Sequence, residues 1–223
     1  MKKNDNKDKS DIISFRIITI GDSGVGKTSI IKKYLYNLFD DRSLQTIGLN
    51  FSFKEISLKN GEQIHLKLID TAGEERYKSM SKSYYKNCDA VLFVFDYNNI
   101  ETFENITEWI SLFKENHNWK KGIPAYLIGN KSDLEKKVEK DAIDKLVNET
   151  GYEFKEVSAR NDDDKKLGKL FEEIAEKLYE DYVKSGRGNK SQNTIKIAHN
   201  KAPKKKGCCI FGPDIVQPNE KFD

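Results

Sequence analysis

An eight-residue segment from Gly21 to Thr28 has the residue types and the spacing of a loop that binds phosphate groups. It reads GDSGVGKT and follows the apolar run 17–20, which is the pattern G-x-x-x-x-G-K-[ST] directly behind an expected strand. Its glycines let backbone N–H groups turn towards an anion, and the helix that follows adds partial positive charge. Lys27 can reach the β- and γ-phosphates of a nucleotide, and the Thr28 hydroxyl can bind Mg²⁺. The segment therefore predicts a phosphate site formed by Ser23, Gly24, Val25, Gly26, Lys27, Thr28 and Ser29.

An acidic residue stands at the end of a second expected strand. The run 64–69 alternates apolar and polar residues and leads into Asp70, Thr71, Ala72 and Gly73. An Asp in this place can hold Mg²⁺ directly or through water, and a glycine allows the backbone to approach a γ-phosphate. With the phosphate loop (residues 21–28) upstream, we expect Asp70 to be a metal ligand rather than a turn residue.

Two later strand ends carry residues suited to a purine base. The apolar run 125–128 is followed by Gly-Asn-Lys-Ser-Asp, in which the Asp133 carboxylate can accept hydrogen bonds from guanine N1–H and N2–H₂. Adenine lacks that edge, so the carboxylate would discriminate between the bases. Asn130 can tie its loop to the phosphate loop, and the stem of Lys131 can lie on the base. The run 152–157 is followed by small residues whose backbone N–H groups can reach guanine O6, namely Ser158, Ala159 and Arg160.

Strand and helix signals alternate along most of the chain, which predicts an α/β fold. It is a doubly wound, mostly parallel six-stranded sheet with one antiparallel edge strand. The expected strands are 13–20, 51–58, 64–69, 90–95, 125–128 and 152–157. The expected helices are 29–38, 102–113, 141–150 and 167–183. The pair Asn60-Gly61 predicts a hairpin turn, and Gly151 is expected to end a helix.

Charge is distributed unevenly over the 223 residues, whose formal net charge is +3. Residues 184–223 hold nine Lys or Arg and three acidic residues, and they show no periodicity. We expect a flexible extension at 1–11, a domain at 12–183 and a disordered basic tail at 184–223. The basic tail favours an anionic membrane surface over nucleic acid, with a merely solvated linker as the alternative. Three cysteines form no disulfide framework, which favours a reducing intracellular setting.

The ordered set of motifs resembles a Ras-superfamily small GTPase over residues 12–183. The motifs are GDSGVGKT, Thr46, DTAG, NKSD and SAR. The Rab branch is the most similar, because 46–51 read TIGLNF, 76–80 read RYKSM and 83–86 read SYYK. The resemblance implies the fold of the small G domain, binding of GTP, GDP and Mg²⁺, and hydrolysis of GTP.

The same resemblance implies roles for residues outside the motifs already described. Thr46 would contact Mg²⁺ through its hydroxyl and the γ-phosphate through its N–H, and Phe39 would lie against the guanine edge. The implied catalytic residues are Lys27, Thr46, Gly73 and Glu74. The implied effector surface consists of Ile47, Gly48, Phe51, Ile69 and Tyr84.

Residues 69–76 depart from the family pattern at two positions. Rab-type chains read WDTAGQER here, and this chain reads IDTAGEER. Ile69 replaces an aromatic residue of the effector surface, so familiar Rab partners cannot be assumed. Glu74 replaces the Gln that positions the attacking water, and an ionised Glu accepts hydrogen bonds without donating any. We expect a slow intrinsic GTPase whose stimulation by an activating protein is weakened; a carboxylate that acted as a base would instead raise the intrinsic rate.

A cysteine pair near the end of the chain departs from the pattern as well. Cys208 and Cys209 follow the basic run 204–206, as in Rab tails built for geranylgeranylation. The fourteen residues 210–223 follow the pair, whereas Rab cysteines normally end the chain. S-palmitoylation, prenylation after trimming or on a differently terminated transcript, and the absence of any lipid are the three open readings.

These features together predict a Rab-like GTP-dependent switch in membrane trafficking. It would be a monomer that meets an exchange factor, an activating protein and Rab-type effectors, and it would be cytoplasmic with peripheral attachment to an intracellular membrane. A GTP-loaded scaffold with negligible turnover is an alternative because of Glu74, and a Ras-like signalling GTPase is another. A nucleotide kinase is disfavoured, because it would leave the NKSD motif unexplained.

Overall fold

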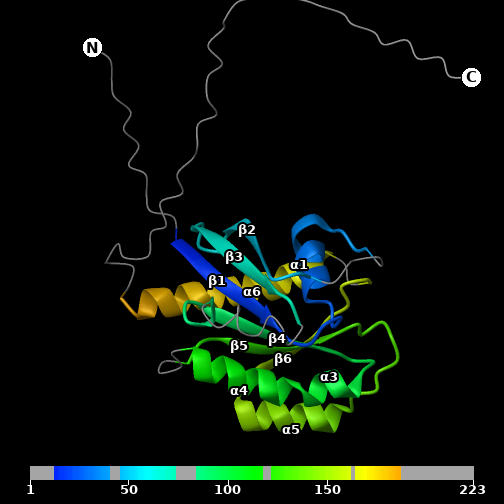
Figure 1. Ribbon diagram of the computed structural model, residues 1–223. Helices are drawn as coiled ribbons and strands as arrows, with labels where there is room; N and C mark the ends of the chain where they lie inside the picture. Colours follow the sequence, from blue (N-terminus) through cyan, green and yellow to red (C-terminus); the bar gives the residue numbers. More distant parts are fainter. Residues whose placement is uncertain (1–12, 41–45, 74–83, 118–121, 162–163, 187–223) are drawn as a thin grey trace, which may run out of the picture.

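The computed structural model describes residues 13–40, 46–73, 84–117, 122–161 and 164–186, and its centre is one six-stranded sheet (Figure 1). The strand order is β2-β3-β1-β4-β5-β6. Only the pair β2–β3 is antiparallel, among the strands of the described residues, which confirms the predicted sheet. The strands are β1 Ile13–Ile20, β2 Leu49–Ser57, β3 Gln63–Thr71, β4 Ala90–Asp96, β5 Ala125–Asn130 and β6 Glu153–Glu156.

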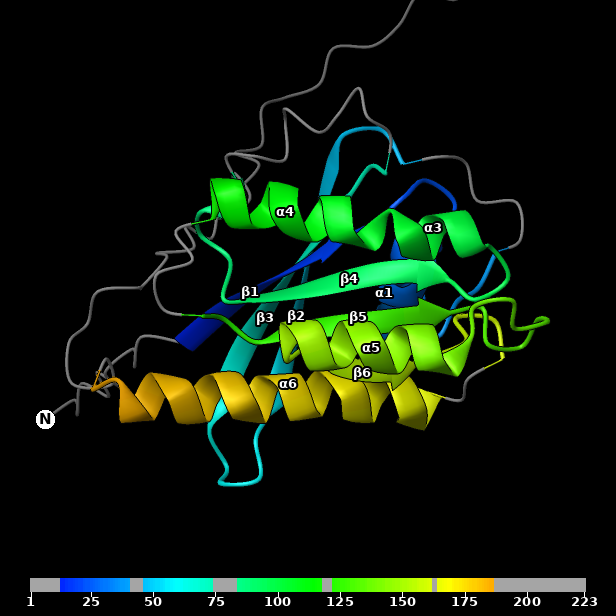
Figure 2. The same cartoon turned by 90° about the horizontal axis from the view of Figure 1, so that it is seen from below.

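Helices cover both faces of this sheet (Figures 1 and 2). On one face lie α1 (Lys27–Tyr36) and α6 (Asp164–Lys184), and on the other lie α3 (Ile100–Glu104), α4 (Ile106–Asn116) and α5 (Lys140–Thr150). None of the helices in the described ranges is long and apolar enough to cross a bilayer.

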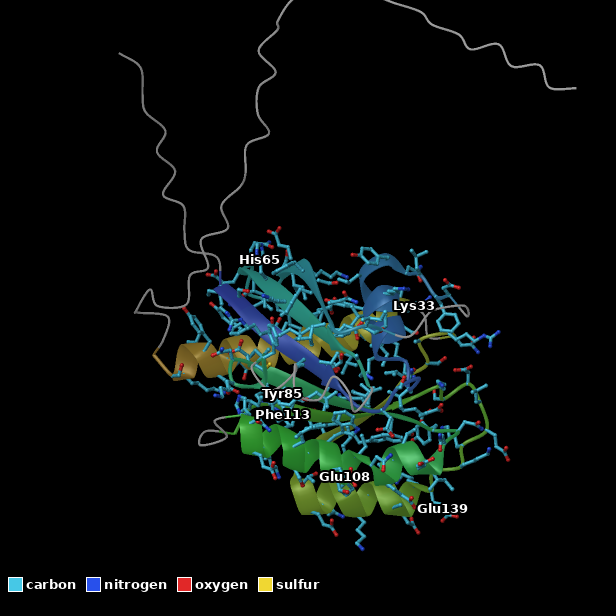
Figure 3. All side chains as sticks on the ribbon, viewed as in Figure 1. Lys33, His65, Tyr85, Glu108, Phe113 and Glu139 are labelled. Atoms are coloured by element: carbon cyan, nitrogen blue, oxygen red, sulfur yellow. The ribbon has the colours of Figure 1, made fainter. Side chains whose placement is uncertain are left out.

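The alternation of side chains along the strands creates a separate core on each face. Ile17 and Leu92 pack in the core beneath α1 and α6, while Ile18 and Phe93 pack in the core beneath α4 and α5. All seven residues of β4 are buried, because this central strand faces helices on both sides. In the second core Tyr85 packs against Phe113 of α4 with 5.3 Å between ring centroids, and both are labelled in Figure 3.

Helix α1 begins two residues earlier than the periodicity predicted. Its first residue is Lys27, because Gly26 takes the left-handed conformation (φ 94°) and ends the phosphate loop. The helix ends at Tyr36, where Asn37 is also left-handed (φ 53°) and its N–H donates to the Lys33 carbonyl. The lysine and threonine of the phosphate loop therefore stand in the first turn of the helix.

The single helix predicted at 102–113 is wrong in one respect, because the structure contains two helices there. The chain breaks at Asn105, between α3 and α4. The turn predicted at Asn60-Gly61 is confirmed, since Gly61 has φ 87° and connects β2 to β3. Gly151 ends α5 in the left-handed conformation as expected. The extension 1–11 and nearly all of the tail lie outside the described residues, so their boundaries stay predictions.

Candidate functional site

A cavity of about 380 Å³ opens where the phosphate loop meets the carboxyl ends of β1, β3 and β5. Parallel α/β sheets bind ligands at this edge. Most of the nucleotide-binding residues predicted from the sequence line it, together with three others. The lining consists of Ser23, Gly24, Gly26, Lys27, Thr28, Ser29, Phe39, Asp40, Thr46, Thr71, Gly73, Asn130, Lys131, Asp133, Leu134, Ala159 and Arg160.

Two glycines let the phosphate loop lie close to the strands. Gly21 has φ 148°, and a Cβ there would collide with the carbonyl of Val94 in β4. Gly26 has φ 94°, and a Cβ there would collide with the side-chain amide of Asn130. A side chain at either position would displace the loop from the sheet, which explains why these positions are glycine.

The ammonium group of Lys27 lies inside the phosphate loop. Its Nζ donates to the Gly21 carbonyl at 2.9 Å and to the Asp22 carbonyl at 2.7 Å, and the side chain is buried. Burial lowers the pKa of Lys27 to about 8, against the opposing influence of the Asp70 and Asp22 charges. A buried cation at this position suits a multiply charged phosphate, whose charge would oppose the cost of burial.

The three predicted metal ligands come together at the end of β3 and the start of α1. Thr28 Oγ1 donates to Asp70 Oδ2 at 2.7 Å and lies 2.5 Å from Thr46 Oγ1. Asp70 is buried, burial raises the pKa of its carboxyl, and its Oδ1 has no hydrogen-bond partner among the described residues. Two hydroxyls and a carboxylate are oxygen donors of the kind that Mg²⁺ prefers. This oxygen, which has no hydrogen-bond partner, could serve as a ligand of a bound cation.

Gly73 packs directly against the phosphate loop. A Cβ at this position would collide with the backbone of Asp22 and Ser23. Its own strand, β3, ends two residues before it at Thr71, whose hydroxyl donates to the Thr19 carbonyl of β1 at 2.8 Å. The backbone of Gly73 is thereby held beside the phosphate loop, and its predicted approach to a γ-phosphate stays a prediction.

Asn130 joins the predicted base loop to two other segments. Its Nδ2 donates to the Val25 carbonyl at 2.8 Å, and its Oδ1 accepts from the Ala159 N–H at 3.1 Å. The side chain is 1% exposed. The predicted link between this loop and the phosphate loop is therefore present in the structure.

The carboxylate predicted to read guanine is held by the neighbouring loop. Ser158 Oγ donates to Asp133 Oδ1, while Asp133 itself is exposed at the cavity. Lys131 takes a left-handed conformation with φ 61°, and its Nζ lies 2.6 Å from Asp96 Oδ2 at the end of β4. These contacts hold the side chains of two residues that line the cavity.

The structure corrects the predicted effector surface at Ile69. This side chain is 1% exposed and packs in the core beneath α4, so it presents no surface in the described structure. Ile69 is buried because it lies on β3, one strand inward from the edge strand β2 that carries the exposed Phe51. Gly48 is also buried, and its carbonyl accepts from the Ala72 N–H at 2.9 Å.

Three residues of the predicted effector surface are exposed, and two of them are in contact. Ile47 is 78% exposed, and Phe51 and Tyr84 lie with ring centroids 5.3 Å apart. The amine of Lys67 lies 4.5 Å from the centre of the Phe51 ring. Apolar side chains that are exposed next to one another are typical of a contact surface.

Sequence reasoning missed three residues that line the cavity and a contact behind it. Asp40, Thr71 and Leu134 line the cavity, and no spacing signal singled them out. The contact is made by Trp109, whose indole N–H donates to the Asp22 side chain at 2.7 Å. Eighty-seven residues separate this pair, so no local pattern could find it.

Several predicted site residues cannot be placed by this cavity. Val25 and Ser158 are buried and contact lining residues rather than the cavity. Glu74, Cys208 and Cys209 lie outside the described residues, so their roles stay predictions.

Comparison with known proteins shows the family of the chain. Residues 16–180 match the model of the Ras family. The chain is 38% identical over 149 residues to Ras-related protein Rab-13 of Bos taurus, covering 66% of the chain and 72% of that relative. It is 35% identical over 184 residues to Rab-13 of Canis lupus familiaris, covering 82% and 86%. Identity to Ras-related protein SEC4 of Saccharomyces cerevisiae is 34% over 200 residues, covering 87% and 90%.

Proposed function

The chain belongs to the Ras family of small GTPases and is most like its Rab branch, and from that premise we propose that the cavity binds GTP and GDP with Mg²⁺ and hydrolyses GTP. The observation that carries the proposal is that two groups of residues meet at one cavity. Thr28 contacts both Asp70 and Thr46, and Asn130 joins the phosphate loop to the loop that carries Asp133. The first group suits a metal-bound phosphate and the second suits a guanine base, so we name these the phosphate end and the base end.

At the phosphate end, the residues act mainly through charge and position. Lys27 and the backbone N–H groups of the phosphate loop would stabilise phosphate oxygens. Thr28, Thr46 and Asp70 would hold Mg²⁺, which when bound would neutralise negative charge that develops on the phosphate oxygens. Thr46 and Gly73 would contact the γ-phosphate through their N–H groups, and these contacts would be lost after hydrolysis. The protein would thereby switch between two states.

Hydrolysis transfers the γ-phosphoryl group to water. The water oxygen forms a bond to the γ-phosphorus while the bond from that phosphorus to the bridging oxygen of GDP breaks. We propose that the Glu74 carboxylate accepts a hydrogen bond from the attacking water. We also propose that the intrinsic rate of hydrolysis is slow, because a carboxylate donates no hydrogen bond to a phosphate oxygen. The sequence difference at this position supports the proposal.

Turnover can be tested by single-turnover release of phosphate from wild type and Glu74→Gln. We expect the two rates to differ, and we expect an activating protein to stimulate Glu74→Gln more strongly than wild type. Equal rates with and without an activating protein would refute the role given to Glu74. GTP binding without detectable phosphate release from wild type would instead support the GTP-loaded scaffold.

At the base end, the Asp133 carboxylate would accept from guanine, the stem of Lys131 would cover the base, and the Ala159 N–H region would face O6. Phe39, which is 36% exposed at the rim of the cavity, would lie against the guanine edge. A competition assay with fluorescent GDP tests this assignment. We expect GTP and GDP to compete and ATP to fail, and we expect Asp133→Asn to weaken GDP binding by about tenfold or more, because an amide donor would then face guanine donors. Equal competition by ATP would refute guanine recognition.

The same family membership makes the chain a Rab-like switch in vesicle trafficking. We propose that it acts as a monomer with a domain at 12–183, and that Ile47, Phe51 and Tyr84 meet effectors in the GTP state. The basic tail at 184–223 would attach it peripherally to an anionic membrane, with or without a lipid on Cys208 or Cys209. Mass spectrometry of the tail peptide from native cells distinguishes prenylation, palmitoylation and unmodified thiols.

A further inference from the structure

The carboxylate of Asp22 connects the phosphate loop to helix α4. Its Oδ2 accepts from Asn105 Nδ2 at 2.8 Å, and its Oδ1 accepts from Trp109 Nε1 at 2.7 Å. Both donors reach a charged acceptor, and such hydrogen bonds are about twice as strong as neutral ones. The two bonds use both oxygens of the carboxylate, so we call this group of three residues the Asp22 clamp.

The fold presents the two donors on one side of α4. Asn105 stands at the break between α3 and α4, and its carbonyl accepts from the Trp109 N–H at 3.2 Å. The two residues are therefore one helical turn apart, and their side chains lie over the same surface. Glu108, labelled in Figure 3, is on the exposed side of the helix. The break at Asn105, absent from the sequence prediction, places its amide at the start of α4.

The backbone of Asp22 is engaged in the nucleotide site at the same time. Its carbonyl accepts from Lys27 Nζ at 2.7 Å, and the backbone of Gly73 packs against it and Ser23. Displacement of Asp22 would therefore move a partner of the phosphate-binding lysine and the segment that would contact the γ-phosphate. A side-chain contact with α4 can thus be transmitted to the phosphate end of the cavity.

We propose that Asp22 is a positioning residue, and that the Asp22 clamp holds the phosphate loop in the shape that retains nucleotide. The inference rests on the proposed function, since it concerns the lifetime of the nucleotide complex. The clamp acts through Lys27 and the loop backbone rather than by touching the base. Loss of either donor would loosen the loop and increase the dissociation rate of GDP.

Substitution of Trp109 separates the hydrogen bond from packing. The Trp109 side chain is 5% exposed and packs in the core beneath α4, and Trp109→Phe keeps an aromatic ring while it removes the indole N–H. Asp22→Asn keeps the shape of the side chain, but its amide donor opposes one of the two donors of α4. Ser111→Ala is the matched control on α4, because Ser111 is exposed and its hydroxyl donates to the Thr107 carbonyl at 2.9 Å.

The experiment measures stopped-flow release of fluorescent GDP, with Mg²⁺ present, from full-length wild type and each variant. A hydrogen bond to a charged group is worth a factor of about ten, so we expect about tenfold faster release from Asp22→Asn. We expect about fivefold to tenfold faster release from Trp109→Phe, and no change from Ser111→Ala. The double variant should release GDP at most about twice as fast as the faster single variant, because both substitutions break the same contact.

A spectroscopic readout separates positioning from a general loss of stability. In ¹H–¹⁵N spectra of GDP-bound protein, Asp22→Asn should shift the indole proton of Trp109 upfield, and Trp109→Phe identifies that signal. Release rates equal to those of Ser111→Ala in both variants, with the signal shifted, would overturn the inference. Release that accelerates only in proportion to a lowered melting temperature would overturn it as well. If Asp22→Asn fails to fold, the rate of Trp109→Phe decides. Failure of wild type to bind GDP would instead refute the proposed function.

Discussion

Removal of the Asn130 side chain tests whether one buried amide holds the two halves of the cavity together. In Asn130→Ala, the carbonyl of Val25 and the N–H of Ala159 each lose their hydrogen bond to this side chain. Both residues are buried, at 0% and 3% exposure, so water replaces the amide poorly. Each buried group left without a partner costs about 1–3 kcal/mol. We therefore expect the free energy of unfolding to fall by about 3 kcal/mol, a large part of the total for a domain.

The assay is thermal unfolding at a series of GDP concentrations with Mg²⁺ present. For a protein of this size about 3 kcal/mol corresponds to a fall of about 6–12 °C in Tm. Bound GDP stabilises the folded state in proportion to the logarithm of its concentration over Kd. A larger difference between variant and wild type at saturating GDP than without GDP would show that Asn130 also shapes the nucleotide site, and we expect that larger difference.

Two further variants make the result specific. Asn98→Ala is a matched control, because the Asn98 amide donates to the Glu135 carbonyl at 3.0 Å in an exposed place. We expect a change within about 0.5 kcal/mol there. Asn130→Asp keeps the acceptor for the Ala159 N–H, but a carboxylate oxygen would then face the Val25 carbonyl. Although the two side chains are nearly equal in size, we expect this variant to bind GDP more weakly than wild type. The reasoning is wrong if the free energies of unfolding of Asn130→Ala and Asn98→Ala differ by less than about 0.5 kcal/mol, which is the resolution of such measurements.

Three other predictions follow from contacts around the cavity and the core. Asp70→Asn should reduce by about tenfold the acceleration of GDP release that EDTA causes in wild type, since a carboxylate ligand is lost; a full EDTA effect would contradict the metal site. Asp96→Asn should weaken GDP binding by about threefold to tenfold because it loosens Lys131, and an unchanged Kd would remove that role. Burial raises the pKa of Cys88 to about 12, so its thiol stays protonated at pH 8. Titration with a thiol reagent should therefore find one more reactive thiol after unfolding than before, and an equal count would contradict the burial.

The phosphate loop, Asp70 and the Asn130–Asp133 loop could be predicted because each follows a strand with a strong apolar signal. The carboxyl ends of parallel strands meet at one edge of a sheet, so chain order alone brings these segments together. The alternation of the β2–β3 hairpin and its Asn60-Gly61 turn were equally local signals. The start of α1 was harder to predict, because it is set by the left-handed conformation of Gly26 and not by the periodicity of apolar residues.

Ile69 shows that the position of a residue in a family motif does not determine whether its side chain is exposed. The family pattern groups it with the exposed Phe51, and the two residues are register partners, Phe51 in β2 and Ile69 in β3. Register partners share a face of the sheet, yet Phe51 is 39% exposed on its edge strand and Ile69 is 1% exposed on the next strand inwards. Strand order, which is a tertiary property, decides between surface and core.

By itself, the sequence determined which chemical groups the protein possesses and the order in which the chain presents them. Residues 21–28, Asp70 and Asp133 predict a phosphate loop, a metal ligand and a residue that binds the base, because the required residue types lie within a few positions of a strand end. Only the tertiary structure decided how these groups support one another. The bond of Trp109 to Asp22 and that of Asn130 to Val25 join residues 87 and 105 positions apart. Such contacts depend on how helices and strands pack, and no local pattern in the chain encodes them.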